Sequence, residues 1–449
     1  PSEGEGVEPA DFVECNADET QCTLSGLIDQ DYTLVSGVEW RLSGEVVVGT
    51  GNREVSSQAD VEAVRAAGVT LTIRPGVHVR AFDDGSLIVT RGSKLNAVGS
   101  AASPITFSSV TDDDFDGEGE WGGVIIQGFA PQYGQGGTGA CWGDGDSGVC
   151  NVQGEGGTIV GLYGGDDPAD DSGRISYVRI AEGGLVAGPN NEINGLTLQG
   201  VGHSTRIDHV HVHGNLDDGI EWFGGTVNVT YAVLTNNDDD DIDFDEGYKG
   251  NIQYAIVRKN PNKSAPTGSN DPRGIEANSS DDEYVPETDA VLANVLVLGS
   301  DVNNDPGSEE GVQPGMRLRG ALTVAIYNSA VRDFDTGCIR IDDADTNGDG
   351  DIDVLSDVTL VNVPGECVEG YYNKREADSA TNAGAGTVTV DAAYALTDPG
   401  TDVGPTDIPA VDNGSGFTFD NTSYIGAVEP GTSAGSAWWA GWIIEGSLD

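Results

Sequence analysis

Basic side chains are scarce in this sequence, which has 21 Lys and Arg residues against 75 Asp and Glu residues, for a formal net charge of −54. Such a charge repels nucleic-acid phosphates and anionic membranes, so we expect neither as a partner. The negative charge predicts an association with cations, for example with bound divalent ions. Alternatively, the acidic surface only keeps the protein soluble in a salty medium. Hydrophobic residues make up 37% of the chain, which is enough for a core and argues against a disordered acidic tail.

Long apolar runs are also lacking. No stretch reaches the roughly 18 apolar residues that a membrane-spanning helix needs, so we predict no membrane span. The chain begins at Pro1 without a signal peptide or a cysteine for a lipid anchor, and we expect the mature form of an exported protein. The expected location is extracellular or at the cell surface.

Cysteines number only six, and none has the Cys-x-x-Cys spacing of a zinc site. An even count in an exported chain indicates disulfides formed in an oxidising compartment. Their order along the chain predicts three pairs, which are Cys15 with Cys22, Cys141 with Cys150, and Cys338 with Cys367.

Helical patterns are almost absent, and the one convincing helix covers Ser57 to Ala67. The rest of the chain consists of short alternating runs, such as residues 69–79, that are separated by glycine and polar turns. Residues 217–222 (DDGIEW) then reappear 22 residues later as residues 239–244 (DDDIDF). One coil of a parallel β-helix, with three short strands, needs about this period. The sequence therefore predicts an all-β, right-handed parallel β-helix.

The repeat divides the chain into three parts. Residues 1–68 are an N-terminal segment and cap, which could mediate assembly, residues 69–370 form the β-helix, and residues 371–449 form an aromatic-rich tail. The open end of a β-helix exposes strand edges and core, so we expect the tail to pack along the helix and cap it. Alternatively, its tryptophans form a docking surface for another subunit or a glycan; they are Trp438, Trp439 and Trp442.

One polar residue between two apolar or small ones recurs in each coil. Because strand side chains alternate between faces, these polar residues should form an outward ladder, which reads Glu221, Asp243, Glu276, Arg317, Arg340, Glu369. The three neighbouring acids should repel one another unless a cation lies among them. The step from Glu276 to Arg317 predicts an ion pair between coils.

Several long segments resemble a broad family of bacterial secreted cell-surface proteins and putative lipoproteins. They are residues 172–184 (SGRISYVRIAEGG), 191–228, 239–253 and 120–128 (EWGGVIIQG), with YIGAV and WWAGW near the end. The resemblance runs from about residue 69 to the C-terminus and implies export and a right-handed β-helix. The family has no assigned reaction, so the resemblance implies no mechanism.

The sharpest chemical motif spans residues 345–353. Oxygen-bearing side chains occupy alternate positions around a glycine at the sixth, as in a calcium loop, and they are Asp345, Asn347, Asp349, Asp351 and Asp353. Ser356 replaces the glutamate that usually closes such a loop, so we expect closure by another acid, such as Asp357, or a weaker site. The alternative is a solvated acidic turn.

Two further groups are candidate ligands for Ca²⁺. One precedes Trp121 with similar spacing and comprises Asp112, Asp114, Asp116, Glu118 and Glu120. The other lies in two turns that the repeat stacks, and comprises Asp217, Asp218, Asp239, Asp240 and Asp241. Stacked carboxylates either bind a cation or raise one another's pKa.

Familiar catalytic motifs, such as GxSxG, HExxH and a phosphate loop, are missing. The sequence therefore favours a secreted, calcium-stabilised structural or surface protein that assembles with itself into a filament or matrix. One alternative is a polysaccharide lyase or glycoside hydrolase for acidic glycans, which would use Ca²⁺ beside Arg317 and Arg340. Another is an adhesin or glycan-binding module with exposed aromatics such as Trp142 and Tyr163. Both alternatives make extracellular glycans partners.

Overall fold

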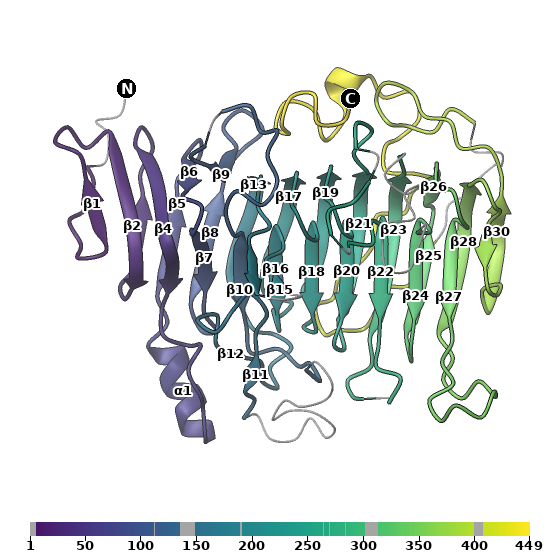
Figure 1. The fold of residues 1–449 in the computed structure, drawn as a ribbon, viewed down its shortest axis with the longest axis horizontal. Coiled ribbons are helices and arrows are strands. Elements are labelled where there is room, and N and C mark those ends of the chain that lie inside the picture. The colour runs from purple at the N-terminus through teal and green to yellow at the C-terminus, as the bar shows by residue number, and fades with distance from the viewer. Residues whose placement is uncertain are drawn as a thin grey trace.

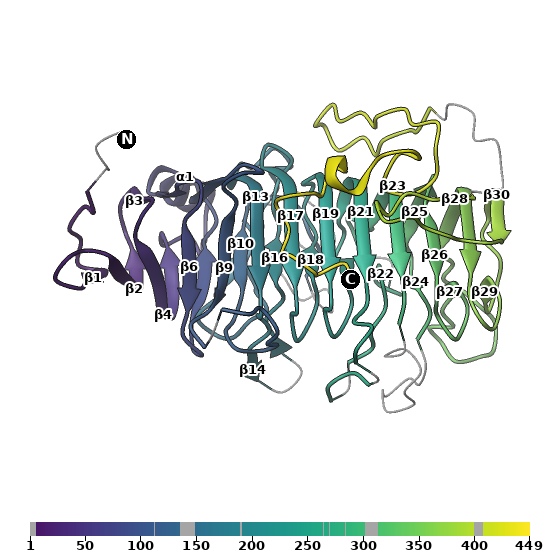
Figure 2. The same ribbon diagram turned by 90° about the horizontal axis from the view of Figure 1, so that it is seen from above.

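The computed structural model describes residues 6–111, 113–134, 149–188, 191–263, 265–268, 270–282, 284–300, 313–398 and 407–449. Its strands coil around one long axis and stack into a parallel β-helix, seen from the side in Figure 1 and from above in Figure 2. Each coil contributes strands to three walls. In the described ranges, no helix has the length and apolar composition needed to cross a bilayer.

The first wall consists of short strands that pair in parallel from coil to coil. They are residues 45–48 of β4 (Glu39–Val48), β7 (Ser86–Val89), β10 (Val124–Gln127), β16 (Leu196–Gln199), β18 (Ile220–Phe223), β20 (Ile242–Asp245), β22 (Ile275–Asn278), β24 (Met316–Arg319), β27 (Ile339–Asp342) and β29 (Tyr372–Asn373).

The other two walls share several long strands, each of which bends from the second wall into the third. The long strands are β13 (Gly173–Ala181), β17 (Arg206–His213), β19 (Val229–Thr235), β21 (Lys249–Arg258), β23 (Asp289–Leu298), β28 (Asp357–Glu366) and β30 (Ser379–Ala385). Shorter strands complete the second wall, namely β3 (Tyr32–Leu34), β5 (Thr70–Ile73), β8 (Lys94–Val98) and β25 (Thr323–Tyr327). The third wall also contains β2 (Gln21–Ile28), β6 (His78–Ala81), β9 (Ile105–Ser109), β26 (Ala330–Arg332) and the start of β4.

A few elements lie outside the walls. The helix α1 (Gln58–Ala66) begins after Ser57, whose hydroxyl accepts the N–H of Asp60 at 3.2 Å, and this agrees with the predicted helix. β1 (Val13–Cys15) pairs antiparallel with β2, β11 (Val152–Gln153) with β12 (Leu162–Tyr163), and β14 (Val186–Gly188) with β15 (Asn191–Glu192). A 3₁₀ turn, η3, covers Ala434–Ser436.

Stacked apolar side chains fill the interior of the solenoid. On the first wall the register aligns Ile220, Ile242, Ile275, Met316 and Ile339, all of which are buried. Ile220 and Ile242 are 22 residues apart, as the repeat predicts. The next step is longer because a loop is inserted between β21 and β22 without disturbing the register.

Left-handed residues form the bends between the second and third walls. In the N-terminal half the bend positions hold stacked rings, with centroids 4.2 Å apart between Tyr177 and His209 and 4.5 Å apart between His209 and Tyr231. Farther along, asparagines take over, and Asn362 donates from Nδ2 to Oδ1 of Asn328 at 2.8 Å. Asparagine tolerates this conformation better than other non-glycine residues. At the aromatic positions, ring stacking offsets the energetic cost of the left-handed conformation.

The solenoid extends beyond the boundaries that the repeat indicated. β2 already pairs in parallel with β4, so the parallel walls begin well before residue 69, and they continue through β30 beyond residue 370. The insertion that contains α1 hides the first coils from a search for a period. The structure contains the predicted disulfides Cys15–Cys22 and Cys338–Cys367, whereas Cys141 lies outside the described residues.

The C-terminal tail packs along the side of the solenoid. Figure 2 shows it running back from the C-terminal end toward the middle. Trp442 is fully buried in an outer apolar cluster with Val233, Ile256 and Leu296, which point outward from the third wall. The predicted packing along the helix is therefore present, while capping of the open end stays a prediction.

Candidate functional site

The polar ladder lies on the outer face of the first wall. Its register is Glu221, Asp243, Glu276, Arg317, Arg340, as expected from the repeat. The predicted ion pair between Arg317 and Glu276 is present at 3.4 Å. The last rung differs from the prediction, because Asn373 and not Glu369 pairs with Arg340, after the turn that follows Cys367.

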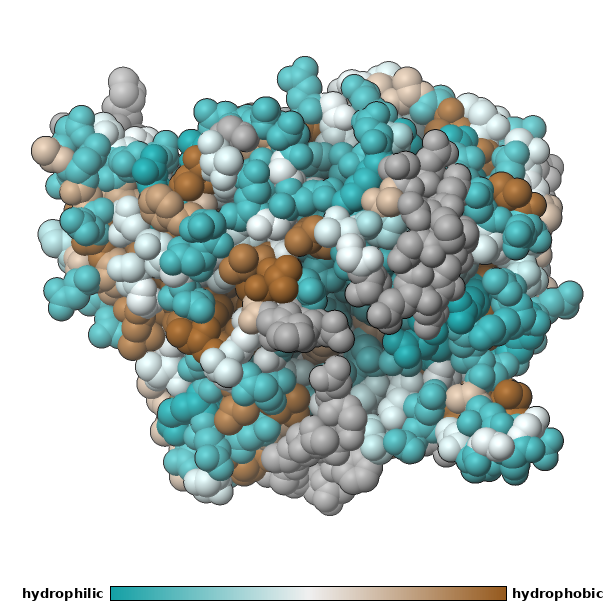
Figure 3. Space-filling view, viewed as in Figure 1, coloured by the Kyte–Doolittle hydropathy of each residue, from teal (hydrophilic) through white to brown (hydrophobic). Residues whose placement is uncertain are grey.

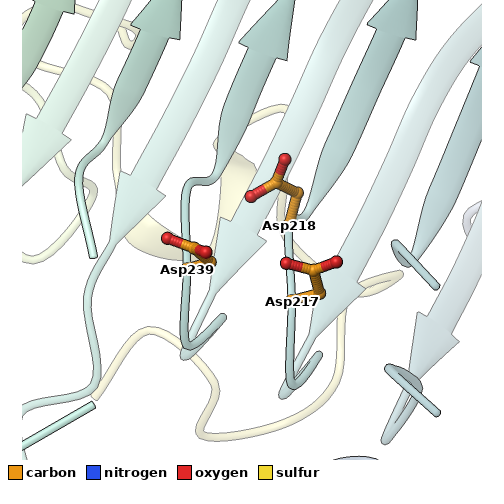
Figure 4. A group of neighbouring side chains, drawn as sticks. All are labelled: Asp217, Asp218 and Asp239. Carbon is orange, nitrogen blue, oxygen red and sulfur yellow. The ribbon is translucent and has the colours of Figure 1, made fainter. Parts of the chain in front are cut away.

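Four of the five predicted turn acids gather beside this ladder. Figure 4 shows Asp217, Asp218 and Asp239, whose nearest carboxylate oxygens lie within 4.8 Å of one another. Asp218, Asp240 and Asp243 satisfy the same limit, so Asp218 belongs to both groups. Stacking of successive coils places the turn before β18 directly beside the turn before β20.

Asp241 does not join the other turn acids. Its carboxylate accepts from Nζ of the fully buried Lys259 at 2.9 Å and from Nδ2 of Asn237 at 2.8 Å. Nζ of Lys259 also donates to the carbonyl of Asp239. This ion pair ties the turn to the following loop and gives the Asp241 carboxylate a cationic partner within the chain, while its role as a calcium ligand stays a prediction.

The four gathered turn acids and the ladder residues from Glu221 to Arg317 line a cleft of about 340 Å³. It brings together ten acids and three arginines, which are Glu155, Glu192, Asp217, Asp218, Glu221, Asp239, Asp240, Asp243, Asp271, Glu276, Arg273, Arg317 and Arg319, together with Asn270. Figure 3 shows this side of the molecule, where hydrophilic residues predominate over β22 to β27. Most of the acids gather in one half of the cleft, toward β18 and β20, and the arginines lie in the other half, at β22 and β24.

In the acidic half, burial and mutual repulsion raise the carboxyl pKa values. Burial raises the pKa of Glu155 to about 7, and Glu155 shares hydrogen bonds with Glu221 and Asn194. Asn194 donates from Nδ2 to Glu221 at 2.5 Å. Burial and the charge of Asp217 raise the pKa of Asp239 to about 8. Because such neighbours cannot all ionise together, the acidic half holds protons at neutral pH unless a cation replaces them.

The arginine half has the opposite effect on Glu276. Burial alone would raise the pKa of Glu276, but the charges of Arg273, Arg319 and Arg317 hold it below its usual range. Arg273, which is 2% exposed, contacts Asp240 at 3.1 Å and Glu276 at 3.2 Å. Two carboxyl groups on adjacent rungs, Asp243 and Glu276, therefore have pKa values shifted in opposite directions.

Some cleft residues were missed because they come from insertions that have no counterpart in the repeat. Glu155 lies in the loop between β11 and β12, and Asp271 and Arg273 precede β22. Arg319 is an exception, since the alternation along β24 places it on the same face as Arg317 and could have revealed it. Ion-pair distances make its role clear, because its Nε lies 2.9 Å from Glu276.

The predicted loop at residues 345–353 lies elsewhere, on the exposed surface. The Asp345 carboxylate accepts the backbone N–H groups of Gly348 at 2.6 Å and of Gly350 at 2.7 Å, and Asp353 accepts that of Thr346 at 2.9 Å. Calcium binding by this loop stays a prediction.

The acidic loop before Trp121 is also separate from the cleft. Asp112 lies outside the described residues, Asp114 and Asp116 are exposed, and Glu118 pairs with Lys263 at 2.7 Å. Glu120 has one buried carboxylate oxygen without a hydrogen-bond partner. Calcium binding here stays a prediction too.

Solved structures that are distantly similar to this chain include three proteins. The crystal structure of the periplasmic alginate epimerase AlgG has a TM-score of 0.30 and 10% identity, over 83% of this chain and 79% of that one. The catalytic domain of a GH87 α-1,3-glucanase in complex with tetrasaccharides has a TM-score of 0.28 and 9% identity, over 81% of this chain and 63% of that one. The Streptococcus pneumoniae surface protein and adhesin PfbA has a TM-score of 0.26 and 10% identity, over 80% of this chain and 90% of that one.

No curated protein matches the sequence. In contrast, the model of a family described as the pectate-lyase-like β-helix domain matches residues 26–398, which include all the strands that bear the cleft. This chain belongs to the pectate-lyase-like β-helix domain family.

Proposed function

We propose that this chain is an exported enzyme that cleaves an acidic polysaccharide in the cleft on its first wall. The family to which it belongs is named after a polysaccharide-cleaving enzyme, which supports this hypothesis over a purely structural role. The observation that carries the proposal is one cleft in which Glu155 and Asp243 have raised pKa values, while Glu276, one rung from Asp243, has a lowered one. Acid–base cleavage of a glycosidic bond needs a protonated and an ionised carboxyl group at once.

Glu155 is the proposed general acid. A pKa of about 7 keeps a large share of this carboxyl protonated near neutral pH, ready to protonate a leaving oxygen. Glu276 is the proposed base, because the charges of Arg273, Arg319 and Arg317 hold its pKa below its usual range and so keep it ionised. It lies two rungs beyond Glu221, the hydrogen-bond partner of Glu155, which leaves room for a water molecule between the acid and the base.

The arginine half of the cleft is the proposed binding site for the acidic groups of the substrate. Rungs of a β-helix are about 4.8 Å apart, which is close to the length of one sugar unit, so a glycan along the axis would place about one unit on each rung. Arg317 and Arg319 would then face a carboxylate while the neighbouring unit lies at the acids. Arg–carboxylate contacts are favourable and directional.

Cation-assisted β-elimination is a second candidate chemistry. The observation that favours it is the pair of overlapping carboxylate groups that share Asp218, because Ca²⁺ prefers several carboxylate oxygens. In that case the cation would neutralise a uronate, and the raised pKa values would fall on binding. Hydrolysis is the simpler proposal, because the raised pKa of Glu155 already supplies a proton donor and no cation is needed.

The proposal is tested with product release from polygalacturonate, alginate and neutral glucans, with reducing ends and ultraviolet-absorbing unsaturated ends measured separately. We expect reducing ends without unsaturation, from an acidic polymer, and their loss in Arg317→Ala. Glu369→Gln, which changes an acid outside the cleft, is the matched control and should keep full activity. Unsaturated ends that vanish with a chelator would favour the second chemistry, and no products from any polymer would reject both.

A further inference from the structure

A second cavity lies in the seam between the tail and the solenoid. It has a volume of about 580 Å³ and shares no lining residue with the cleft. Three segments that are far apart in the sequence meet there and contribute Phe115, Tyr394, Trp439 and Glu445. Arg179 of β13 also lines it. This volume is typical of sites that enclose a small ligand.

Arg179 is the unusual feature of this cavity. It is half-buried, and its register neighbour on the next rung is His211, whose pKa burial lowers well below its usual value, so no negative charge faces it from there. Its Nε donates to the carbonyl of Trp442, and within the described part of the chain it forms no ion pair with an acid. In a chain with 75 acidic residues, this leaves the terminal N–H groups of a desolvated guanidinium available. Burial accordingly lowers its pKa.

Aromatic rings supply the walls. Trp439 donates its indole N–H to the carbonyl of Ala393 at 2.9 Å, so its ring surface is what it can offer to a ligand. Tyr394 meets Trp439 edge to face, with ring centroids 6.1 Å apart. Phe115 and Trp439 are both partly exposed. Such surfaces suit the apolar face of a sugar ring, which presents C–H groups.

Charged groups at the rim do not neutralise Arg179. Asp114, Glu445 and Asp449 line the cavity but are exposed, so solvent screens their charges. An unpaired, partly buried cation next to aromatic walls is matched by a ligand that has one carboxylate and an apolar ring face. A uronic acid unit of a glycan has both.

We propose that this cavity is a second glycan-binding site, in which the terminal guanidinium nitrogens of Arg179 hold the carboxylate of a uronic acid unit against Trp439. The site goes beyond the proposed function, because binding there requires no cleavage in the cleft. It would keep the protein attached to an acidic polymer while the first wall acts on another stretch.

Calorimetric titration of the full chain with digalacturonic acid tests the proposal, with uncharged galactobiose as the comparison ligand. We expect binding of the acid, at least about ten-fold weaker binding of galactobiose, and an affinity about ten-fold lower in Arg179→Gln. Phe115→Ala, which alters the wall opposite the tail, should also weaken binding. Phe417→Ala, a partly exposed aromatic elsewhere in the tail, is the matched control and should change the affinity by less than about two-fold.

Because Arg179→Gln removes a hydrogen bond to the tail, protease resistance of residues 407–449 is measured in parallel. If that resistance falls, the binding affinity of Phe115→Ala is the measurement that tests the site. The proposal fails if galactobiose binds equally well, if neither variant weakens binding, or if Arg317→Ala in the cleft removes all binding. Loss of binding in Arg179→Gln with intact cleavage in the cleft supports this site independently of the enzyme hypothesis.

Discussion

Glu155 is the proposed general acid of the cleft, and its replacement tests that role. Glu155→Gln keeps the shape and one hydrogen bond but cannot donate a proton to a leaving oxygen. We expect kcat to fall by about 100-fold or more, the usual scale for a general acid. Activity of the wild type should decline as pH rises through about 7, where Glu155 loses its proton. A pH profile in which the wild type stays fully active well above that value would contradict this role.

The raised pKa values also predict how stability depends on pH. Glu155 and Asp239 have folded pKa values of about 7 and about 8, above their unfolded values near 4. Between the unfolded and the folded pKa values, the folded chain binds more protons than the unfolded chain. The contribution of these two carboxyl groups to the free energy of unfolding is therefore complete at low pH and is lost as pH rises through the folded pKa values. In the presence of a chelator, denaturant unfolding should show a smaller decline from pH 5 to 8 for Glu155→Gln than for the wild type. Equal slopes would contradict the pKa assignment.

At the scale of elements, the bend between the second and third walls recurs with a left-handed residue in successive coils. Asn328 is fully buried with φ +47°, accepts from Asn362, and donates to Thr422 of the tail at 3.1 Å. Asn328→Gly should relieve the backbone strain but lose the side-chain hydrogen bonds. Asn328→Ala should lose the same hydrogen bonds and keep the strain. We expect Asn328→Ala to be less stable than Asn328→Gly by about 1 kcal/mol in urea unfolding. An alanine variant that is the more stable of the two would show that the bend carries no strain.

Elements of the solenoid could be predicted where the repeat is visible. The rungs from Glu221 to Arg340 and the disulfide between Cys338 and Cys367 follow from a regular period and alternating faces. The bends could not be foreseen, because Tyr177 and Asn362 occupy equivalent positions with unrelated chemistry. Glu155 and Arg273 escaped prediction since they come from loops whose return to the first wall depends on tertiary packing. For the same reason, Asp241 was grouped with its neighbours although Lys259 holds it apart.

For the whole molecule, calcium remains a prediction with a clear stability signature. Ca²⁺ and protons should compete for the acidic half of the cleft, so added Ca²⁺ should raise the melting temperature more at pH 8 than at pH 5. At 100 times its Kd, a ligand adds about 2.7 kcal/mol. Asp218→Asn removes a ligand from both carboxylate groups and should reduce this gain, whereas Glu369→Gln should keep it. A response of Asp218→Asn equal to that of the wild type would place any calcium elsewhere, and Asp349→Asn would then test the exposed loop.

Self-assembly into a filament or matrix also stays a prediction. β2 and β4 belong to the parallel walls, so residues 1–60 cannot be removed to test it without damage to the solenoid. The segment before β2 is also tied to the coils, because Cys15 forms a disulfide with Cys22 of β2 and Phe12 belongs to the core. Electron microscopy of the intact chain with and without Ca²⁺ remains the suitable measurement.

The most direct measurement is a crystal structure of Glu155→Gln with an acidic oligosaccharide that the wild type degrades. We predict sugar density along β18 to β24, with a carboxylate at Arg317 or Arg319 and a glycosidic oxygen within hydrogen-bond reach of residue 155. An oligosaccharide bound only away from the first wall, with the cleft filled by water, would contradict the account.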